Sequence, residues 1–287
     1  MRVSLLFNTK SGRGKAGPLS EVLNSALNSR GHTVSFFDVS KTIHATQDAV
    51  ANGDIVCVLG GDGSVHHALP HLMNSPVSMY HVPLGTENLF SRDWQMTSDP
   101  DVVVLAVDGN RTELIDVGMA GDRPFALMLS LGPDASVIQR VQDARTGPIT
   151  HASYLSPVIA EFLSPALRPL SIWVDGNQVV DAQRGICVIA NSSQYGGRID
   201  PAAQASLTDG MLDLYFAPAT NGIDVARHLL NARFRFSTRD KVVTCRGTNI
   251  RLDAGDLPSQ IDGEPFQAAT GELSCSIVPR ALRVLLP

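Results

Sequence analysis

The sequence predicts two regions of different class: an α/β domain with helices on both faces of a parallel sheet, giving three layers, and then a β-sandwich. Up to about residue 117, short apolar runs typical of buried strands alternate with segments whose apolar residues recur at helical spacing. From about residue 118, short strand-like runs follow one another with turn residues between them. The chain of 287 residues is long enough for two such cores.

In the first region the expected strands cover residues 2–8, 33–37, 55–59, 78–82 and 113–117. A helix is expected from Pro18 to Gly31, others at 45–52 and 66–73, and a helix or buried segment at 100–107. Strands that alternate with helices favour a doubly wound parallel sheet, which binds ligands at the carboxyl ends of its strands.

A glycine-rich turn follows the third expected strand. Residues 60–64 are Gly-Gly-Asp-Gly-Ser, and a helical pattern comes next, with Ser64 as the expected N-cap. Glycines let the backbone approach a phosphate, and the free N–H groups of a helix N-terminus favour an anion. Asp62 would repel a phosphate unless a cation lay between them, which indicates a nucleotide with a metal ion. A tight turn without a ligand stays open as the alternative.

Two other strand ends carry similar residues. Residues 8–17 follow the first strand and are rich in glycine and positive charge, and residues 83–88 (Pro-Leu-Gly-Thr-Glu-Asn) follow the fourth. The three loops are therefore expected at the same edge of the sheet.

In the second region, expected strands cover 170–174, 185–189, 211–216, 241–245 and 248–252. Helical patterns at 135–141, 154–162 and 223–232 interrupt them, and the run 281–286 is apolar enough to be a buried strand.

Composition narrows the function. The chain is 44% hydrophobic and 18% charged, as is ordinary for a soluble globular protein, and its net charge of −5 argues against a general nucleic-acid binder. No apolar run approaches the ~18 residues that span a bilayer, and the N-terminus does not resemble a signal peptide, so we expect a cytoplasmic protein. The four cysteines form no CxxC pair and are expected to be buried free thiols.

Seven segments together resemble the diacylglycerol kinase catalytic-domain family, which includes bacterial lipid kinases, sphingosine kinases and ceramide kinases. The matching segments, in the family order, are residues 8–12, 60–64, 83–88, 130–135, 195–201, 209–213 and 261–264. The resemblance implies an ATP-binding α/β domain over residues 1–117 plus 279–287 and a lipid-substrate β-sandwich domain over residues 118–278.

The resemblance also implies an ATP- and Mg²⁺-dependent lipid kinase that transfers the γ-phosphate to a hydroxyl of a lipid such as diacylglycerol, a sphingoid base or phosphatidylglycerol. Glu264 would be the base, Asp62 would orient the magnesium ion and Asp116 would join an acidic network behind it. The residues alone favour a different interpretation, in which Glu264 is a turn carboxylate after Asp262-Gly263. The expected nucleotide-binding residues are Asn8, Ser11, Gly12, Ser40, Gly60, Gly61, Asp62, Gly63, Ser64, Thr86, Glu87 and Asn88.

A second magnesium site is implied at Asp209, with the backbone carbonyls of Ser206 and Met211 as further oxygen ligands. An ordinary turn before a strand is the alternative there.

The chain departs from the family pattern at three positions. Thr9 stands where the family usually has proline, Ser64 where it has threonine, and Leu89 where relatives often have aspartate. The loss of that aspartate puts the details of magnesium binding in doubt unless Glu87 replaces it, and leaves a weakened or inactive kinase open.

The lipid side is less specific. Aliphatic residues in 158–170 and 135–141 suit an acyl-chain cleft, although core packing explains them equally well. A basic cluster suits an anionic membrane surface, with a solvated face as the alternative. Its members are Arg227, Arg233, Arg235, Arg239, Lys241, Arg246 and Arg251.

Two rival functions remain at this point. NAD kinases and phosphofructokinases share the Gly-Gly-Asp-Gly loop, so a soluble-substrate kinase of the NAD kinase type is one, although residues 83–88 and 262–264 resemble the lipid branch. A non-catalytic nucleotide or lipid sensor is the other. The expected partners are a lipid alcohol substrate, peripheral membrane and a second copy in a homodimer, with no nucleic acid.

Overall fold

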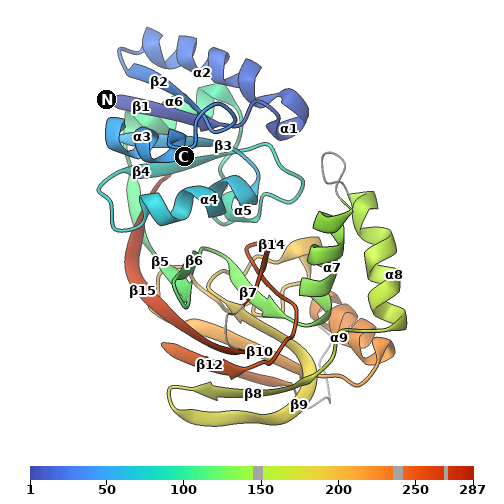
Figure 1. The fold of residues 1–287 in the computed structure, drawn as a ribbon. Helices are drawn as coiled ribbons and strands as arrows, with labels where there is room; N and C mark the ends of the chain where they lie inside the picture. Colours follow the sequence, from blue (N-terminus) through green and yellow to red (C-terminus); the bar gives the residue numbers. More distant parts are fainter. Residues whose placement is uncertain (145–150, 235–241, 268–270) are drawn as a thin grey trace. The chain divides into compact units, whose positions relative to one another are not determined.

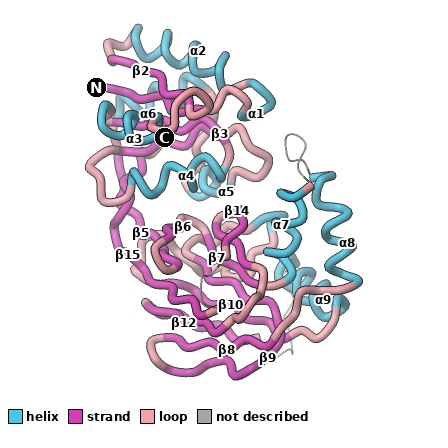
Figure 2. Tube along the Cα trace, in the orientation of Figure 1, coloured by secondary structure: helices cyan, strands magenta, loops and turns pink. Residues whose placement is uncertain are grey.

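The computed structural model describes residues 1–144, 151–234, 242–267 and 271–287. The chain has a two-domain architecture of α/β and β-sandwich type, as the sequence predicts (Figure 1). Unit 1 comprises Met1–Asp116 with Pro279–Pro287, and unit 2 comprises Val117–Val278. Figure 2 shows that helices and strands alternate in unit 1, whereas strands dominate unit 2.

Unit 1 contains a parallel sheet in the order β2-β1-β3-β4-β15. The sheet has a central strand, β3, in which every residue is buried, which explains its run of β-branched and aliphatic residues. Only the last part of β15 belongs here, where Arg283 lies opposite Ser78. The strands are β1 (Arg2–Phe7), β2 (Thr33–Asp38), β3 (Ile55–Gly60), β4 (Ser78–Pro83) and β15 (Glu272–Leu285).

Helices connect these strands. The right-handed crossover rule puts the helix after β1 on one face of the sheet and the helices after β2 and β3 on the other. Accordingly α2 contacts α6, and α3 contacts α4. The helices are α1 (Ser11–Gly14), α2 (Ala16–Ser29), α3 (Ala45–Asn52), α4 (Asp62–Leu72), α5 (Leu89–Asp93) and α6 (Pro100–Gly109).

Two helix starts differ from the expectation. Helix α4 begins at Asp62 with Gly61 as its N-cap, so Ser64 lies inside the first turn and the prediction that it caps the helix is wrong. Helix α2 begins at Ala16, before Pro18, and follows the short turn α1, in which Gly12 and Arg13 have left-handed φ angles of 58°.

Unit 2 is built from antiparallel strands. One sheet has the order β14-β13-β7-β9-β10-β11, and β8 pairs with β9 and β12, which in turn pairs with the first part of β15. Buried side chains such as Phe125, Ile172 and Phe216 form its core. The strands are β5 (Thr112–Ala120, which starts in unit 1), β6 (Arg123–Phe125), β7 (Met128–Leu131), β8 (Pro169–Val174), β9 (Asn177–Ala190), β10 (Leu212–Pro218), β11 (Val243–Gly247), β12 (Asn249–Asp253), β13 (Ser259–Ile261) and β14 (Glu264–Phe266).

The helical elements of unit 2 are α7 (Pro133–Asp143), η1 (His151–Tyr154), α8 (Leu155–Leu163), η2 (Gly196–Arg198) and α9 (Gly222–Phe234). Helix α8 contacts both α7 and α9. The strand expected at 185–189 is the last part of the much longer β9, and Lys241 of the strand expected at 241–245 lies outside the described residues.

The four cysteines are free thiols, and Cys57, Cys187 and Cys275 are buried, whereas Cys245 is half-buried. Burial raises the pKa of Cys57 to about 12. Among the described residues, no helix combines the length and apolar character that crossing a membrane requires.

Candidate functional site

Three loops of unit 1 meet at the carboxyl ends of β1, β3 and β4. A Cβ placed on Gly85 would lie 2.7 Å from the Cα of Gly61, so the backbones of the second and third loops are in contact. A Cβ on Gly12 would lie 2.9 Å from Leu84 Cβ, which brings the first loop to the third. The predicted meeting of the three loops at one edge agrees with this geometry.

Gly60 lies where two hydroxyl groups face the backbone. A Cβ on Gly60 would lie 2.1 Å from Ser64 Oγ and 3.8 Å from Ser11 Oγ, so only glycine fits at this position. The carbonyl oxygen of Gly60 accepts a hydrogen bond from Leu84 N at 2.8 Å. Gly60, Ser11 and Ser64 therefore lie close together, and Ser64 contributes its hydroxyl from within the helix.

The N-terminus of α4 opens onto the same edge. First-turn N–H groups of a helix have no intrahelical acceptor and favour an anion. Asp62 lies in this turn, and its Oδ1 accepts a hydrogen bond from Phe90 N at 3.0 Å, while its Oδ2 has no hydrogen-bond partner in the described part of the chain. The turn thus offers N–H donors for phosphate and one free carboxylate oxygen for a hard cation.

A buried histidine contacts the backbone that leads into this turn, and the sequence analysis did not predict it. His81 in β4 is fully buried and its Nε2 lies 3.0 Å from the carbonyl oxygen of Gly60. Burial lowers the pKa of His81, and the negative charge of Asp62 opposes that shift only in part. A histidine inside an otherwise apolar strand run was the available signal.

The first loop is tied to the end of β2. Ser11 N donates to Asn8 O at 2.8 Å, Asn8 Oδ1 accepts from Lys10 N at 2.9 Å, and Thr9 Oγ1 lies 3.1 Å from Ser40 Oγ. Ser40 Oγ also donates to Asp38 Oδ1 at 2.7 Å. Burial alone would raise the pKa of Asp38, but the hydrogen bonds from Ser40 hold it below its usual value. Ser40 thus fixes the loop with its hydroxyl already engaged.

The third loop is shaped by its own side chains. Asn88 is left-handed, with φ of 50°, and its Oδ1 and Nδ2 pair with the N–H and carbonyl of Gly85 at 2.8 and 2.9 Å. Glu87 forms an ion pair with Arg92 at 3.1 Å, and Thr86 is exposed. Leu89, where relatives often have aspartate, is buried in α5.

Asp116 contacts the backbone of the last strand. It is buried in β5, and its Oδ1 accepts from Arg280 N at 2.8 Å, so it anchors the returning β15. The described residues contain no group of three or more His, Cys, Asp and Glu side chains arranged to bind a metal ion. A magnesium ion in unit 1 would therefore need oxygen atoms from the nucleotide or from water besides Asp62.

In unit 2, Glu264 follows a tight hairpin turn between β13 and β14. Asp262 and Gly263 have left-handed φ angles of 52° and 86°, as an Asp-Gly hairpin turn requires. The Asp262 carboxylate accepts hydrogen bonds from the backbone N–H groups of Ala126, Leu127 and Met128 at 2.9, 2.8 and 3.0 Å. This buried carboxylate fixes the base of the turn.

Glu264 itself is half-buried at the start of β14. Gln142 of α7 donates its Nε2 hydrogen to Glu264 Oε2 at 3.3 Å. Glu264 is therefore the first residue after the turn, and its carboxylate contacts a polar side chain from α7.

A buried chain of polar side chains runs through unit 2, and none of its members was predicted as a site residue. Gln260 joins Gly263 N, at 2.7 Å, to Ser130 Oγ, also at 2.7 Å, and both Ser130 and Tyr195 donate to Asp134 Oδ2. Burial raises the pKa of Asp134, and its Oδ1 has no partner among the described residues. The segments 130–135, 195–201 and 261–264 therefore meet in the folded unit.

The second magnesium site predicted at Asp209 does not fit the side chains present. Arg246 pairs with Asp209 and lies 3.3 Å from Asp213, and Asp209 Oδ1 accepts from Met211 N at 3.1 Å. The Ser206 hydroxyl lies 3.3 Å from that of Thr208. The arginine supplies the positive charge that the ion would bring, so we derive no step from a metal here.

The predicted basic cluster is only partly described, because Arg235, Arg239 and Lys241 lie outside the described residues. Arg227 pairs with Asp224 at 3.4 Å, and Arg246 pairs with Asp209. Arg251 lies 3.7 Å over the ring of Trp173 and 3.9 Å from Glu272. These contacts favour separate paired positions over one continuous basic patch.

Two family models match this chain, one in each of its two regions. Residues 2–120 match the diacylglycerol kinase catalytic domain, and residues 128–286 match the YegS C-terminal NAD kinase beta sandwich-like domain. A diacylglycerol kinase of Mycobacterium tuberculosis (strain ATCC 25618 / H37Rv) is 28% identical over 298 residues, covering 100% of this chain and 95% of that protein.

Two solved structures share the fold. A diacylglycerol kinase of Bacillus anthracis str. Sterne superposes with a TM-score of 0.74 at 19% identity, covering 100% of this chain and 97% of that one. An NAD kinase of Archaeoglobus fulgidus in complex with ATP superposes with a TM-score of 0.59 at 15% identity, covering 99% and 93%. With both domain matches spanning its two halves, the chain belongs to the diacylglycerol kinase catalytic-domain family whose C-terminal part is the YegS-type NAD kinase beta sandwich-like domain.

Proposed function

We propose that this protein is an ATP- and Mg²⁺-dependent lipid kinase that transfers the γ-phosphate of ATP to a hydroxyl group of a lipid. Unit 1 binds the nucleotide and unit 2 binds the lipid and supplies the base. The observation that carries the proposal is the meeting of the loops at the N-terminus of α4, held by close contacts at Gly60 and Gly85 that a Cβ would break. The N–H groups of a helix N-terminus suit phosphate oxygens.

In the nucleotide site the backbone N–H groups at the start of α4 bind phosphate oxygens, and the hydroxyls of Ser11 and Ser64 donate to them. Asp62 would hold a magnesium ion through its Oδ2, because its Oδ1 is engaged by Phe90 N. When bound, that ion neutralises the charge on the transferring phosphoryl group.

In unit 2 Glu264 accepts the proton of the acceptor hydroxyl, and Gln142 orients the Glu264 carboxylate. The acceptor oxygen forms a bond to the γ-phosphorus while the bond from that phosphorus to the β–γ bridging oxygen breaks, and ADP leaves. The acceptor becomes a phosphate monoester.

The test is transfer of labelled γ-phosphate from ATP to diacylglycerol, sphingosine, ceramide, phosphatidylglycerol and monoacylglycerol in mixed micelles. We expect one class of lipid to be phosphorylated, and Glu264→Gln to lower the rate by about 10²- to 10⁴-fold, as loss of a general base does. ATP affinity should stay unchanged, and Glu272→Gln, an exposed glutamate of β15, is the matched control. Equal rates in Glu264→Gln and wild type would remove Glu264 from the chemistry.

The NAD kinase likeness makes a soluble acceptor the second candidate, and the same assay includes NAD. Phosphorylation of NAD with no lipid product would decide for that candidate. ATP binding with no product from any acceptor would decide for a nucleotide sensor, for which the buried Leu89 is the motivating feature.

A further inference from the structure

Helix α8 of unit 2 is amphipathic in the inverse of the usual sense. A surface helix normally buries its apolar stripe and exposes its charges. In α8 the single charged residue, Glu161, is only 3% exposed, and the apolar residues face outward. These exposed residues are Leu155, Val158, Ile159, Phe162 and Leu163. Core packing therefore does not explain these aliphatic residues.

Hydrogen bonds hold α8 in this orientation. Glu161 Oε1 accepts from Ser136 Oγ at 2.6 Å and from Arg140 Nε at 3.2 Å, and Oε2 accepts from Ala166 N at 2.9 Å. Turning the apolar face inward would break these bonds and leave buried polar groups unpaired, which is costly. The outward apolar face is thus a fixed feature of unit 2.

Helix α9 extends the same surface. A Cβ on Gly222, its first residue, would lie 1.8 Å from the carbonyl oxygen of Phe162, so the end of α8 packs directly on the start of α9. Ile223, Leu230 and Phe234 recur at helical spacing along α9 and are exposed.

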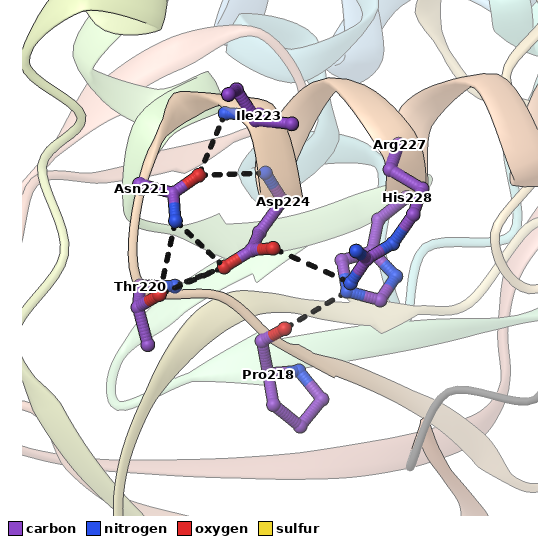
Figure 3. A network of polar contacts seen from close by, with 7 residues as sticks. All are labelled: Pro218, Thr220, Asn221, Ile223, Asp224, Arg227 and His228. Atoms are coloured by element: carbon purple, nitrogen blue, oxygen red, sulfur yellow. Dashed lines mark hydrogen bonds and ion pairs between the residues drawn. The ribbon is translucent and has the colours of Figure 1, made fainter.

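The start of α9 is firmly capped, as Figure 3 shows. Asn221 Oδ1 accepts from Ile223 N and Asp224 N at 2.9 and 3.0 Å, and Asp224 Oδ2 accepts from Thr220 N at 2.9 Å. This network fixes the first turn, and with it the side of the helix on which Ile223 lies.

We call this surface the α8–α9 face. Its members are Leu155, Val158, Ile159, Phe162, Leu163, Ile223, Leu230 and Phe234, which are all the large exposed hydrophobic residues in the described part of unit 2. Single exposed apolar residues are ordinary, but a contiguous group marks a surface that something covers.

The charges around the face indicate what covers it. Helix α9 carries two arginines, although the whole chain has a net charge of −5: Arg227, which pairs with the half-buried Asp224 at 3.4 Å, and the exposed Arg233. The guanidinium of Arg233 lies 5.5 Å from the ring of Phe234, so the positive charge borders the apolar group. Leucine, isoleucine and phenylalanine side chains bordered by arginine are the composition of a helix that lies in the surface of a bilayer.

We propose that the α8–α9 face docks on the surface of an anionic lipid bilayer, with its apolar side chains in the boundary of the acyl region and Arg233 at the headgroups. This docking would deliver unit 2 to a lipid acceptor, and in that respect alone it rests on the proposed function.

The test is flotation with vesicles of phosphatidylcholine, with and without phosphatidylglycerol. The double variant Leu163→Glu/Ile223→Glu replaces side chains that are 76% and 69% exposed, and Leu105→Glu on α6 of unit 1, where the side chain is 62% exposed, is the matched control. We expect the double variant to lose at least about tenfold in vesicle partitioning, since each side chain withdrawn loses the free energy of apolar burial. The control should bind like wild type, and Arg233→Gln should lose only the preference for phosphatidylglycerol.

Wild-type flotation that the double variant loses, with its kinase rate in mixed micelles kept, supports the docking. Equal flotation of the double variant and wild type overturns it, and so does the absence of flotation of wild type. A wild type that sediments as a dimer and binds no vesicles, with a double variant that sediments as a monomer, overturns it as well. Loss of vesicle binding in a protein that phosphorylates no lipid would leave the docking standing and reject the lipid kinase. If the double variant is unfolded by circular dichroism, Leu155→Ser/Leu230→Ser decides by the same comparison.

Discussion

The candidate site of unit 1 is built mainly from backbone atoms, whereas that of unit 2 is built from side chains. At the edge of unit 1 the backbone forms the site, because Gly61 and Gly85 bring main-chain atoms together and a Cβ on Gly85 would lie 2.7 Å from Gly61 Cα. In unit 2 side chains form the site, because Asp262 and Gln260 hold the turn that precedes Glu264. A backbone site needs short contiguous motifs, whereas a side-chain site gathers residues from distant positions.

The two regions also differ in their electrostatics. The edge of unit 1 offers N–H groups and the positive end of a helix, which favour an anion. The polar chain of unit 2 is acidic and buried, and burial raises the pKa of Asp134. The proposed function would thus place ATP binding and proton acceptance in regions with opposite electrostatics.

Removal of divalent cations should give the largest difference between the two regions, because only the proposed site of unit 1 needs a metal ion. With EDTA we expect phosphoryl transfer to fall below detection and to return with added Mg²⁺, because the charge of the transferring group is no longer neutralised. The midpoint of thermal unfolding without nucleotide should not change, since Arg246 rather than a metal ion neutralises Asp209. A drop of several degrees in that midpoint would instead support a structural cation in unit 2.

Gly85→Ala should damage the edge of unit 1 alone. Its Cβ would lie 2.7 Å from Gly61 Cα, which is backbone and cannot swing away, so we expect ATP affinity to fall by about 100-fold or more, equivalent to ~2.7 kcal/mol. Calorimetric titration with ATP measures this. Gly109→Ala, where nothing lies within 4 Å of the added Cβ, should bind ATP normally. Undiminished affinity in Gly85→Ala would show that the contact of the two loops is not needed for ATP.

Asp262→Asn should weaken unit 2. An amide keeps one acceptor oxygen and replaces the other by an NH₂ donor, so at least one of the three backbone N–H groups that Asp262 now satisfies loses its acceptor. We therefore expect a loss of about 2–4 kcal/mol in the free energy of unfolding. Urea unfolding followed by Trp173 fluorescence, in a Trp94→Phe background, reports on unit 2. Asp256→Asn, in an exposed ion pair with Arg168, should change stability by less than about 0.5 kcal/mol. A loss no larger than this control would rule out a supporting role for Asp262.

Asp38→Asn should have the smallest effect, about 1 kcal/mol at neutral pH, because it weakens the hydrogen bonds from Ser40. The folded-state pKa of Asp38 is lowered, so its stabilisation is fully present above the unfolded value of about 3.9 and is lost as the pH falls through the folded-state pKa. Urea midpoints of wild type and variant, followed at Trp94, should therefore converge in acid. A difference that stays constant with pH would assign the effect to packing.

The sequence was sufficient where one physical cause acts locally. Strand β3 is a continuous β-branched and aliphatic run, and the glycines of residues 60–64 mark the turn directly, so the sheet of unit 1 and its loops were predictable. Strands β6, β7, β13 and β14 were not, because three or four residues carry no periodicity. Strand β9 runs fourteen residues through polar positions that interrupt its apolar pattern.

The supporting side chains of unit 2 were beyond sequence reasoning for a different reason. Tyr195 and Asp134 are 61 residues apart in the chain, and Gln260 and Ser130 are 130 apart, so no local pattern joins them. The same holds for the inverted α8, since only the contact of Glu161 with Ser136 shows which side faces inward.

Strand β15 has a consequence for the order in which the chain can fold during synthesis. Its end completes the sheet of unit 1 beside β4, and Arg280 N and Ala281 O bond to Asp116 and to Asn74 N. These residues leave the ribosome after all of unit 2, so the nascent first 116 residues lack one strand of their sheet throughout that interval. Because domains generally fold in order of synthesis, the edge of β4 stays unpaired until β15 has been made. Chains interrupted before residue 279 therefore keep an unpaired strand edge that is open to aggregation or proteolysis.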